Sequence, residues 1–240
     1  MKETRMLKKE IDLLRSLQNR HKNIIQIINL KDEDRCEHPI LVMHYYPHTI
    51  YDAIMRRKAR IPDTFYDDTA GALTYLQQNN ILHNDIKPEN ILLTYKGEPI
   101  LADFGFAQYG PEAKPKDLMG TPGYISPEMK SRFKTHGFKS DQWSLTIVWF
   151  EVLFRQDLFT DEMMHKLYQT DENSISGKRR TPENVKSHIS HQLDFIETRL
   201  REVTKKRPDL YAFFKRATQK DPEERPSLPE LLTSIKGLVS

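Results

Sequence analysis

The chain has 240 residues, a formal net charge of +3 and a single cysteine, Cys36. This length allows one large hydrophobic core or two modest ones. The small net charge does not favour a nucleic-acid partner, and the longest apolar runs are far too short to span a membrane. One cysteine cannot form an intramolecular disulfide, so we expect an intracellular location, cytoplasmic or nuclear.

The first part of the chain predicts one helix and two strands. From Lys2 to Gln18 apolar residues recur at helical spacing. The segments Ile24–Leu30 and Pro39–Met43 are rich in β-branched residues and are separated by a charged turn, which is typical of two neighbouring strands. Pro47 follows soon after and ends the second strand.

The remainder of the chain is expected to be mainly helical. The predicted helices span Ile50–Arg57, Pro62–Gln78, Asp141–Phe154, Asp161–Gln169, Ser187–Thr204, Pro208–Thr218 and Pro229–Val239. Loops and short strands are expected between Asn79 and Glu128. The polar stretch Thr170–Glu183 contains Ser, Gly, Pro and basic residues, and this composition predicts a flexible insertion.

Two motifs in the central loops carry the chemistry. Residues 83–90 read His-Asn-Asp-Ile-Lys-Pro-Glu-Asn, and residues 103–105 read Asp-Phe-Gly. Phosphoryl transfer needs metal ions held against the phosphates, a positive charge on the transferred group and a base that orients the attacking hydroxyl. Asp85 is placed to be that base and Lys87 to be the cation. Asn90 and Asp103 offer the hard oxygen ligands that Mg²⁺ requires.

These motifs resemble the catalytic loop and the D-F-G element of eukaryotic-type protein kinases. Gly120–Glu128 is similar to the family's substrate-binding loop and A-P-E element, with Ser126 in place of Ala. Ser140–Leu145 resembles the start of its central buried helix, and Lys220–Ser227 resembles its closing element. The resemblance therefore covers nearly the whole chain.

The resemblance implies an α+β, protein-kinase-like fold. A partial small lobe of one helix and two strands would occupy residues 1–46, and a mostly helical large lobe would occupy residues 47–240. It also implies ATP and Mg²⁺ as cofactors, a protein as substrate, and transfer to Ser or Thr, because Lys87 and Thr121 follow the family's Ser/Thr pattern.

The resemblance further implies roles for individual residues. Glu10 would be the glutamate of the small lobe's mobile helix, and the hydroxyl of Thr121 would bridge Asp85 and Lys87 as part of the catalytic set. The implied nucleotide-binding residues are Glu10, the gatekeeper Met43, the hinge residues His44, Tyr45 and Tyr46, the adenine floor Leu92, and Lys87, Asn90 and Asp103.

Structural contacts are implied as well. Leu14, His83 and Phe104 would form an apolar column that joins the lobes, and Asp141 would bond the backbone around His83. Glu128 and Arg225 would form a buried ion pair that ties the substrate loop to the large lobe without touching substrate.

One departure from the family concerns the nucleotide phosphates. No two glycines lie two residues apart and none precedes Gly71, so the phosphate-covering glycine-rich loop is absent. The strand lysine that would pair with Glu10 is absent too, because the nearby lysines lie on Glu10's own helix. Three explanations stay open: a truncated true kinase, a kinase completed by a partner protein that covers the small-lobe edge, or a catalytically impaired module that acts by binding a partner. A small-molecule kinase is a weaker alternative.

A second departure concerns regulation. Asn84 stands where the family usually has the Arg that binds a phosphate on the activation loop. Residues 106–119 contain no Ser or Thr, and Tyr109 is their only hydroxyl acceptor. We therefore expect a non-RD kinase whose loop is not switched on by Ser/Thr phosphorylation within it.

Overall fold

The computed structural model describes residues 2–18, 20–31, 40–110, 112–113, 120–130, 136–174 and 182–239. Its helices are α1 (Lys2–Leu17), α2 (Ile50–Met55), α3 (Phe65–Gln78), α4 (Pro127–Lys130), α5 (Phe138–Phe154), α6 (Asp161–Ser174), α7 (Pro182–Val203), α8 (Pro208–Ala217) and α9 (Leu228–Val239), with 3₁₀ turns at Pro88–Asn90 and Pro222–Glu224. Its strands are β1 (Ile27–Lys31), β2 (Ile40–Met43), β3 (His48–Thr49), β4 (Ile81–Leu82), β5 (Ile91–Leu93), β6 (Pro99–Leu101), β7 (Gln108–Tyr109), β8 (Glu112–Ala113) and β9 (His136–Gly137). This confirms the α+β class with a small lobe of one helix and two strands.

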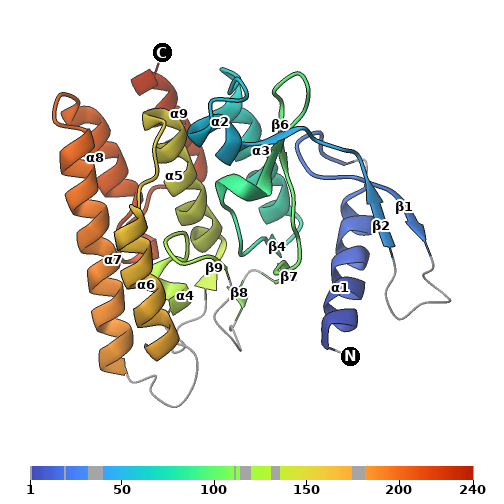
Figure 1. Cartoon of the computed structure of the whole chain (residues 1–240), viewed down its shortest axis with the longest axis horizontal. Helices are drawn as coiled ribbons and strands as arrows, with labels where there is room; N and C mark the ends of the chain where they lie inside the picture. The colour runs from blue at the N-terminus through green and yellow to red at the C-terminus, as the bar shows by residue number, and fades with distance from the viewer. Residues whose placement is uncertain are drawn as a thin grey trace.

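The helix α1 and the β1–β2 pair stand on one side of the larger helical part (Figure 1). The two strands are antiparallel, with Ile27 opposite Met43 and Lys31 opposite Ile40. The predicted start of the first strand at Ile24 is wrong. The Ile25 N–H instead donates to the Leu101 carbonyl at 2.9 Å, so this segment pairs with β6 of the large lobe.

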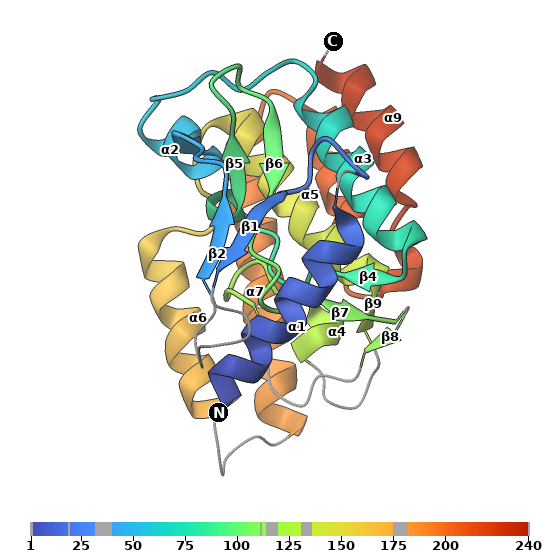
Figure 2. The same cartoon turned by 90° about the vertical axis from the view of Figure 1, so that its right-hand side faces the viewer.

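The apolar face of α1 is directed into the protein. Leu13, Leu14 and Leu17 are each at most 3% exposed and belong to the same apolar cluster as the large-lobe residues. Figure 2 shows α1 running beside β4 and β7. The core is therefore continuous across both parts, and the division into residues 1–46 and 47–240 stays a prediction.

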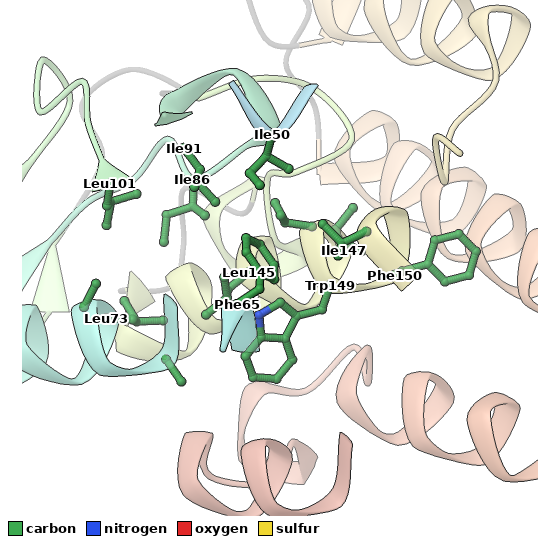
Figure 3. Packing of buried hydrophobic residues seen from close by; sticks show 14 of the residues in the cluster. Ile50, Phe65, Leu73, Ile86, Ile91, Leu101, Leu145, Ile147, Trp149 and Phe150 are labelled. Atoms are coloured by element: carbon green, nitrogen blue, oxygen red, sulfur yellow. The ribbon is translucent and has the colours of Figure 1, made fainter. Parts of the chain in front are cut away.

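The helix α5 is the centre of the large lobe. Thirteen of its seventeen residues are buried, so it is covered on all sides rather than amphipathic. Figure 3 shows Leu145, Ile147 and Trp149 of this helix packed near Phe65 of α3. The indole N–H of Trp149 donates to the Thr69 hydroxyl at 3.1 Å, which satisfies its buried polar atom.

Several predicted helix boundaries are wrong. The expected insertion Thr170–Glu183 is helical at both ends, because α6 continues to Ser174 and α7 begins at Pro182; residues 175–181 lie outside the described part. Pro is favoured at the first position of a helix, since its missing N–H has no partner there in any case.

Smaller shifts affect the other helices. The helix α5 begins three residues early, at Phe138, and α3 begins three residues late, at Phe65. The helix α2 ends at Met55 rather than Arg57, because Arg57 adopts a left-handed backbone with φ of 52°. The predicted strand start at Pro39 lies outside the described residues, and so does Cys36. Among the helices that the structure describes, none has the length and apolarity needed to cross a membrane.

Candidate active site

The central helix α5 anchors the catalytic loop. Asp141 is 1% exposed and accepts hydrogen bonds from the backbone N–H groups of His83 at 2.7 Å and Asn84 at 2.8 Å. Burial raises the pKa of Asp141, and the nearby His83 together with these two N–H donors partly offsets that effect. The predicted contact between Asp141 and the backbone around His83 is therefore present. It fixes the chain two residues before Asp85.

Four of the predicted catalytic residues form one hydrogen-bonded network. The Lys87 ammonium lies 3.1 Å from Asp85 Oδ2 and donates to Thr121 Oγ1 at 2.8 Å. The Thr121 hydroxyl donates to Asp85 Oδ1 at 3.1 Å, which is the bridging geometry implied by the resemblance. Asn90 donates through Nδ2 to both the backbone oxygen and Oδ2 of Asp85, each at 2.9 Å.

The Asp-Phe-Gly turn directly follows Ala102, whose N–H donates to the backbone carbonyl of Asn90 at 2.9 Å. The Phe104 ring packs edge-on against His83, with centroids 4.8 Å apart, and both side chains are buried. Leu14 belongs to the same apolar cluster. Asp103 has a φ of 61°, a left-handed conformation that Asp tolerates better than most residues. The column of Leu14, His83 and Phe104 thus lies in the core as expected.

Glu10 of α1 reaches this turn. Its pKa is raised by burial and by the neighbouring Asp103 carboxylate, and a hydrogen bond from the Phe104 N–H acts in the opposite direction. Among the described residues, Glu10 has no ion-pair partner. The structure therefore brings Glu10 to Asp103, and no described lysine pairs with Glu10.

The predicted adenine-binding residues lie at the end of β2 and on β5. Met43 and Tyr45 are 42% and 76% exposed, and His44 is exposed too, whereas Tyr46 packs against the core. Leu92 is half-buried on β5, where it pairs with Thr49 and Ile100. None of the described hydrogen bonds joins these residues to the catalytic network, so their nucleotide-binding roles stay predictions.

The oxygen donors near Asp85 suit a magnesium ion that arrives with a nucleotide. Both hydrogen bonds of Asn90 to Asp85 use Nδ2, which leaves its amide oxygen facing away from those contacts. The described residues include no group of three or more His, Cys, Asp or Glu that could hold a metal ion alone. Mg²⁺ commonly binds through one or two protein oxygens, with phosphates and water completing its shell. Asn90 and Asp103 fit that arrangement.

A buried ion pair holds Glu128, which closely follows the substrate loop. Arg225 donates to both carboxylate oxygens of Glu128, at 2.8 and 2.7 Å, and both side chains are at most 3% exposed. The guanidinium also lies over the Trp143 ring, 4.8 Å from its centroid. The ion pair predicted from the sequence is present, and its bidentate geometry holds the Ser-Pro-Glu element against α5.

The substrate loop is also bonded to α5 directly. The Tyr124 hydroxyl donates to the Glu151 carboxylate at 2.9 Å, and the Ser144 hydroxyl donates to the Tyr124 carbonyl at 2.8 Å. Burial raises the pKa of Glu151 to about 8, with a smaller contribution from the Asp157 carboxylate. A protonated Glu151 is therefore favoured near neutral pH.

Neutral contacts hold the start of the activation segment. Asn84 Nδ2 donates to the Phe106 carbonyl at 3.0 Å, and the Tyr109 and Ser16 hydroxyls lie 2.7 Å apart. Tyr109 is 59% exposed on β7, where it pairs with Ile81 of β4. These contacts join the segment to the residue before Asp85 and to α1, and the regulation expected from Asn84 stays a prediction.

Sequence reasoning did not identify Gln192, Glu151 or Ser16 as residues near the site. Gln192 is fully buried and lies among Val185, Ile189 and Ile196 at helical spacing. The polar side chain of Gln192 at a position where helical spacing otherwise places apolar residues could have marked it as a candidate for a specific buried contact. The contact between Ser16 and Tyr109, 93 residues apart, carried no such signal.

Comparison with known proteins identifies the family. The model for "Protein kinase domain" matches residues 1–235. The chain belongs to the protein kinase family. Its relatives include Aurora kinase of Schizosaccharomyces pombe, which is 30% identical over 95% of this chain and 58% of its own length.

Two further relatives extend the comparison. Aurora kinase B of Danio rerio is 33% identical over 61% of this chain and 46% of its own length. Serine/threonine-protein kinase ULK3 of Xenopus laevis is 29% identical over 94% of this chain and 44% of its own length. The kinase chain thus spans about half the length of the curated relatives it matches.

Proposed function

We propose that this protein kinase domain transfers the γ-phosphoryl group of ATP to Ser or Thr hydroxyls of proteins, with Mg²⁺ as the metal. One observation carries the proposal: Asp85, Lys87, Thr121 and Asn90 form a single network around one carboxylate. Such an arrangement provides a base and a cation at fixed positions, and phosphoryl transfer depends mainly on positioning and electrostatic stabilisation.

Each residue of the network has a distinct role in this proposal. Asp85 accepts a hydrogen bond from the substrate hydroxyl and orients its oxygen for attack. Lys87 stabilises the negative charge that grows on the transferred group. Thr121 of the substrate loop bonds the side chains of Asp85 and Lys87 and so fixes their positions relative to the loop. ATP bound with Mg²⁺ supplies the transferable phosphoryl group, and Asn90 and Asp103 would hold the metal.

The proposal is tested by phosphotransfer with Mg²⁺, ATP and a generic Ser/Thr protein substrate. Wild-type chain should transfer phosphate, and Asp103→Ala should abolish the transfer because it removes the only carboxylate of the metal set. A matched control is Asp209→Ala, which removes an exposed carboxylate on α8 far from the loop. Activity that persists in Asp103→Ala would contradict the proposal.

A second function is favoured by a different observation. Three apolar side chains of the β1–β2 pair are between 42% and 55% exposed: Ile28, Ile40 and Met43. Exposed apolar side chains on a two-stranded sheet are suited to contact with another protein chain. Under this alternative the domain is a kinase-like module that acts by binding a partner. Magnesium-dependent ATP binding, measured by calorimetry, would favour the enzyme; tight partner binding without any nucleotide response would favour the module.

A further inference from the structure

A buried side chain of the long helix α7 donates hydrogen bonds to the substrate loop. Gln192 is fully buried, and its amide nitrogen Nε2 donates to the backbone carbonyls of Gly123 and Ile125, at 2.9 Å each. These two carbonyls flank Tyr124, the residue whose hydroxyl reaches Glu151. A single amide group therefore fixes the backbone on both sides of Tyr124.

The surroundings of this contact restrict the loop further. Gly123 has a φ of 93°, and a Cβ atom there would lie only 3.1 Å from Met164 and Phe159. The loop is thus pressed against the residues around α6 while Gln192 holds it from α7. Figure 1 shows α4, which directly follows the loop, next to α7.

Burying the Gln192 amide costs free energy, which indicates that its hydrogen bonds to the loop are the reason for a polar residue at this position. Its oxygen Oε1 is buried without a hydrogen-bond partner among the described residues, which is unfavourable for a polar atom. An apolar residue would avoid this cost, and the neighbouring buried positions Ile189 and Ile196 are apolar. The reverse amide orientation would point Oε1 at two carbonyl oxygens, so only the donating orientation fits.

We infer that Gln192 is a positioning residue that sets the shape of the substrate loop, residues 121–126. Through the loop backbone it also sets the place of Thr121, whose hydroxyl bonds Asp85 and Lys87. The consequence for protein-substrate binding rests on the proposed function, whereas the effect on the loop rests on the geometry alone. The affected ligand is the peptide segment of the protein substrate, and nucleotide binding should be unchanged.

The test compares a graded set of variants by hydrogen exchange of the loop amides. Gln192→Met keeps the shape and removes both donors, and a protonated Gln192→Glu keeps one donor. Ile196→Ala is the matched control, because it creates a cavity one turn further along the same buried face. All measurements use the full chain, so they do not depend on its catalytic activity.

We expect exchange in residues 121–126 to accelerate roughly 10- to 100-fold in Gln192→Met, as two lost hydrogen bonds to buried carbonyls would produce. Gln192→Glu should lie between wild type and Gln192→Met. Ile196→Ala should leave loop exchange within about twofold of wild type despite a lower melting temperature. Loop exchange that is unchanged in Gln192→Met, or equally fast in Ile196→Ala, would overturn the inference.

A kinetic readout separates positioning from general stability. In Gln192→Met, KM for a peptide substrate should rise about tenfold or more while KM for ATP stays at the wild-type value. An equal rise in both constants would also overturn the inference. If wild type transfers no phosphate, the proposed function fails, and the exchange experiment still decides the role of Gln192.

Discussion

Arg225 is the residue whose loss should destabilise the protein most clearly. Its guanidinium makes five hydrogen bonds. They go to the two oxygens of Glu128 and to the backbone carbonyls of Gln219, Lys139 and Lys220. The side chain has no exposed surface, so water cannot replace these bonds when the group is removed.

The magnitude follows from counting donors. In Arg225→Lys the ammonium has three N–H donors, so at least two of the five acceptors lose their partner. Each unsatisfied buried acceptor costs about 1–3 kcal/mol, and we therefore expect Arg225→Lys to lose at least about 2 kcal/mol of unfolding free energy. Arg225→Leu leaves Glu128 as an unpaired buried charge and should lose about 3–5 kcal/mol.

Equilibrium urea unfolding of the purified chain measures these values. The double variant Glu128→Leu/Arg225→Leu should be less destabilised than the sum of the two single variants, because it leaves no charge unpaired. Arg207→Leu is the control, since Arg207 pairs with Asp209 at the surface and its loss should change the unfolding free energy far less than the loss of Arg225. A loss below about 1 kcal/mol in Arg225→Lys would show that these buried acceptors do not need the guanidinium.

Three further predictions concern the substrate loop and its support. Ser126→Ala should stabilise the protein by about 1 kcal/mol in urea unfolding, because the Ser126 hydroxyl is buried without a partner among the described residues; a loss of stability would contradict this. Because the pKa of Glu151 is raised to about 8 from 4.5, its contribution to stability is complete below about pH 4.5 and is lost as the pH rises through 8. Glu151→Gln should remove that dependence, so the difference between the two melting-temperature profiles should grow from pH 6 to pH 9, and parallel profiles would count against the raised pKa. Thr121→Val should lower kcat about 10- to 100-fold by freeing Asp85 and Lys87 from their shared hydroxyl, while Thr121→Ser should retain most activity; equal kcat values for both variants would argue against the bridge.

The contacts among the predicted catalytic residues were accessible from the sequence because each depends on a residue type within a motif. The identities of Asp85, Lys87 and Thr121 implied their shared network, and the structure shows it at hydrogen-bond distances. The pairing of Glu128 with Arg225 was likewise implied, although 97 residues separate them. Such contacts recur within a fold, so the motifs carry information about distant partners.

Contacts outside the motifs were not accessible in this way. The β-branched Ile24 and Ile25 predict a strand, but β propensity does not specify a partner, and they pair with Leu101 rather than extend β1. The polar composition of Thr170–Glu183 concealed two helix ends, where the packing of α6 against α7 overrides weak local propensity.

Asp85→Asn tests whether Asp85 orients a substrate hydroxyl for phosphoryl transfer. This substitution keeps the size of the side chain and removes its capacity to act as a base. The measurement is the rate of magnesium-dependent phosphate transfer from ATP to a Ser peptide, with nucleotide affinity determined in parallel. We predict that Asp85→Asn lowers the rate at least about 100-fold and leaves nucleotide affinity unchanged. A wild-type chain that transfers no phosphate, or an Asp85→Asn chain that keeps the wild-type rate, would contradict this role of Asp85.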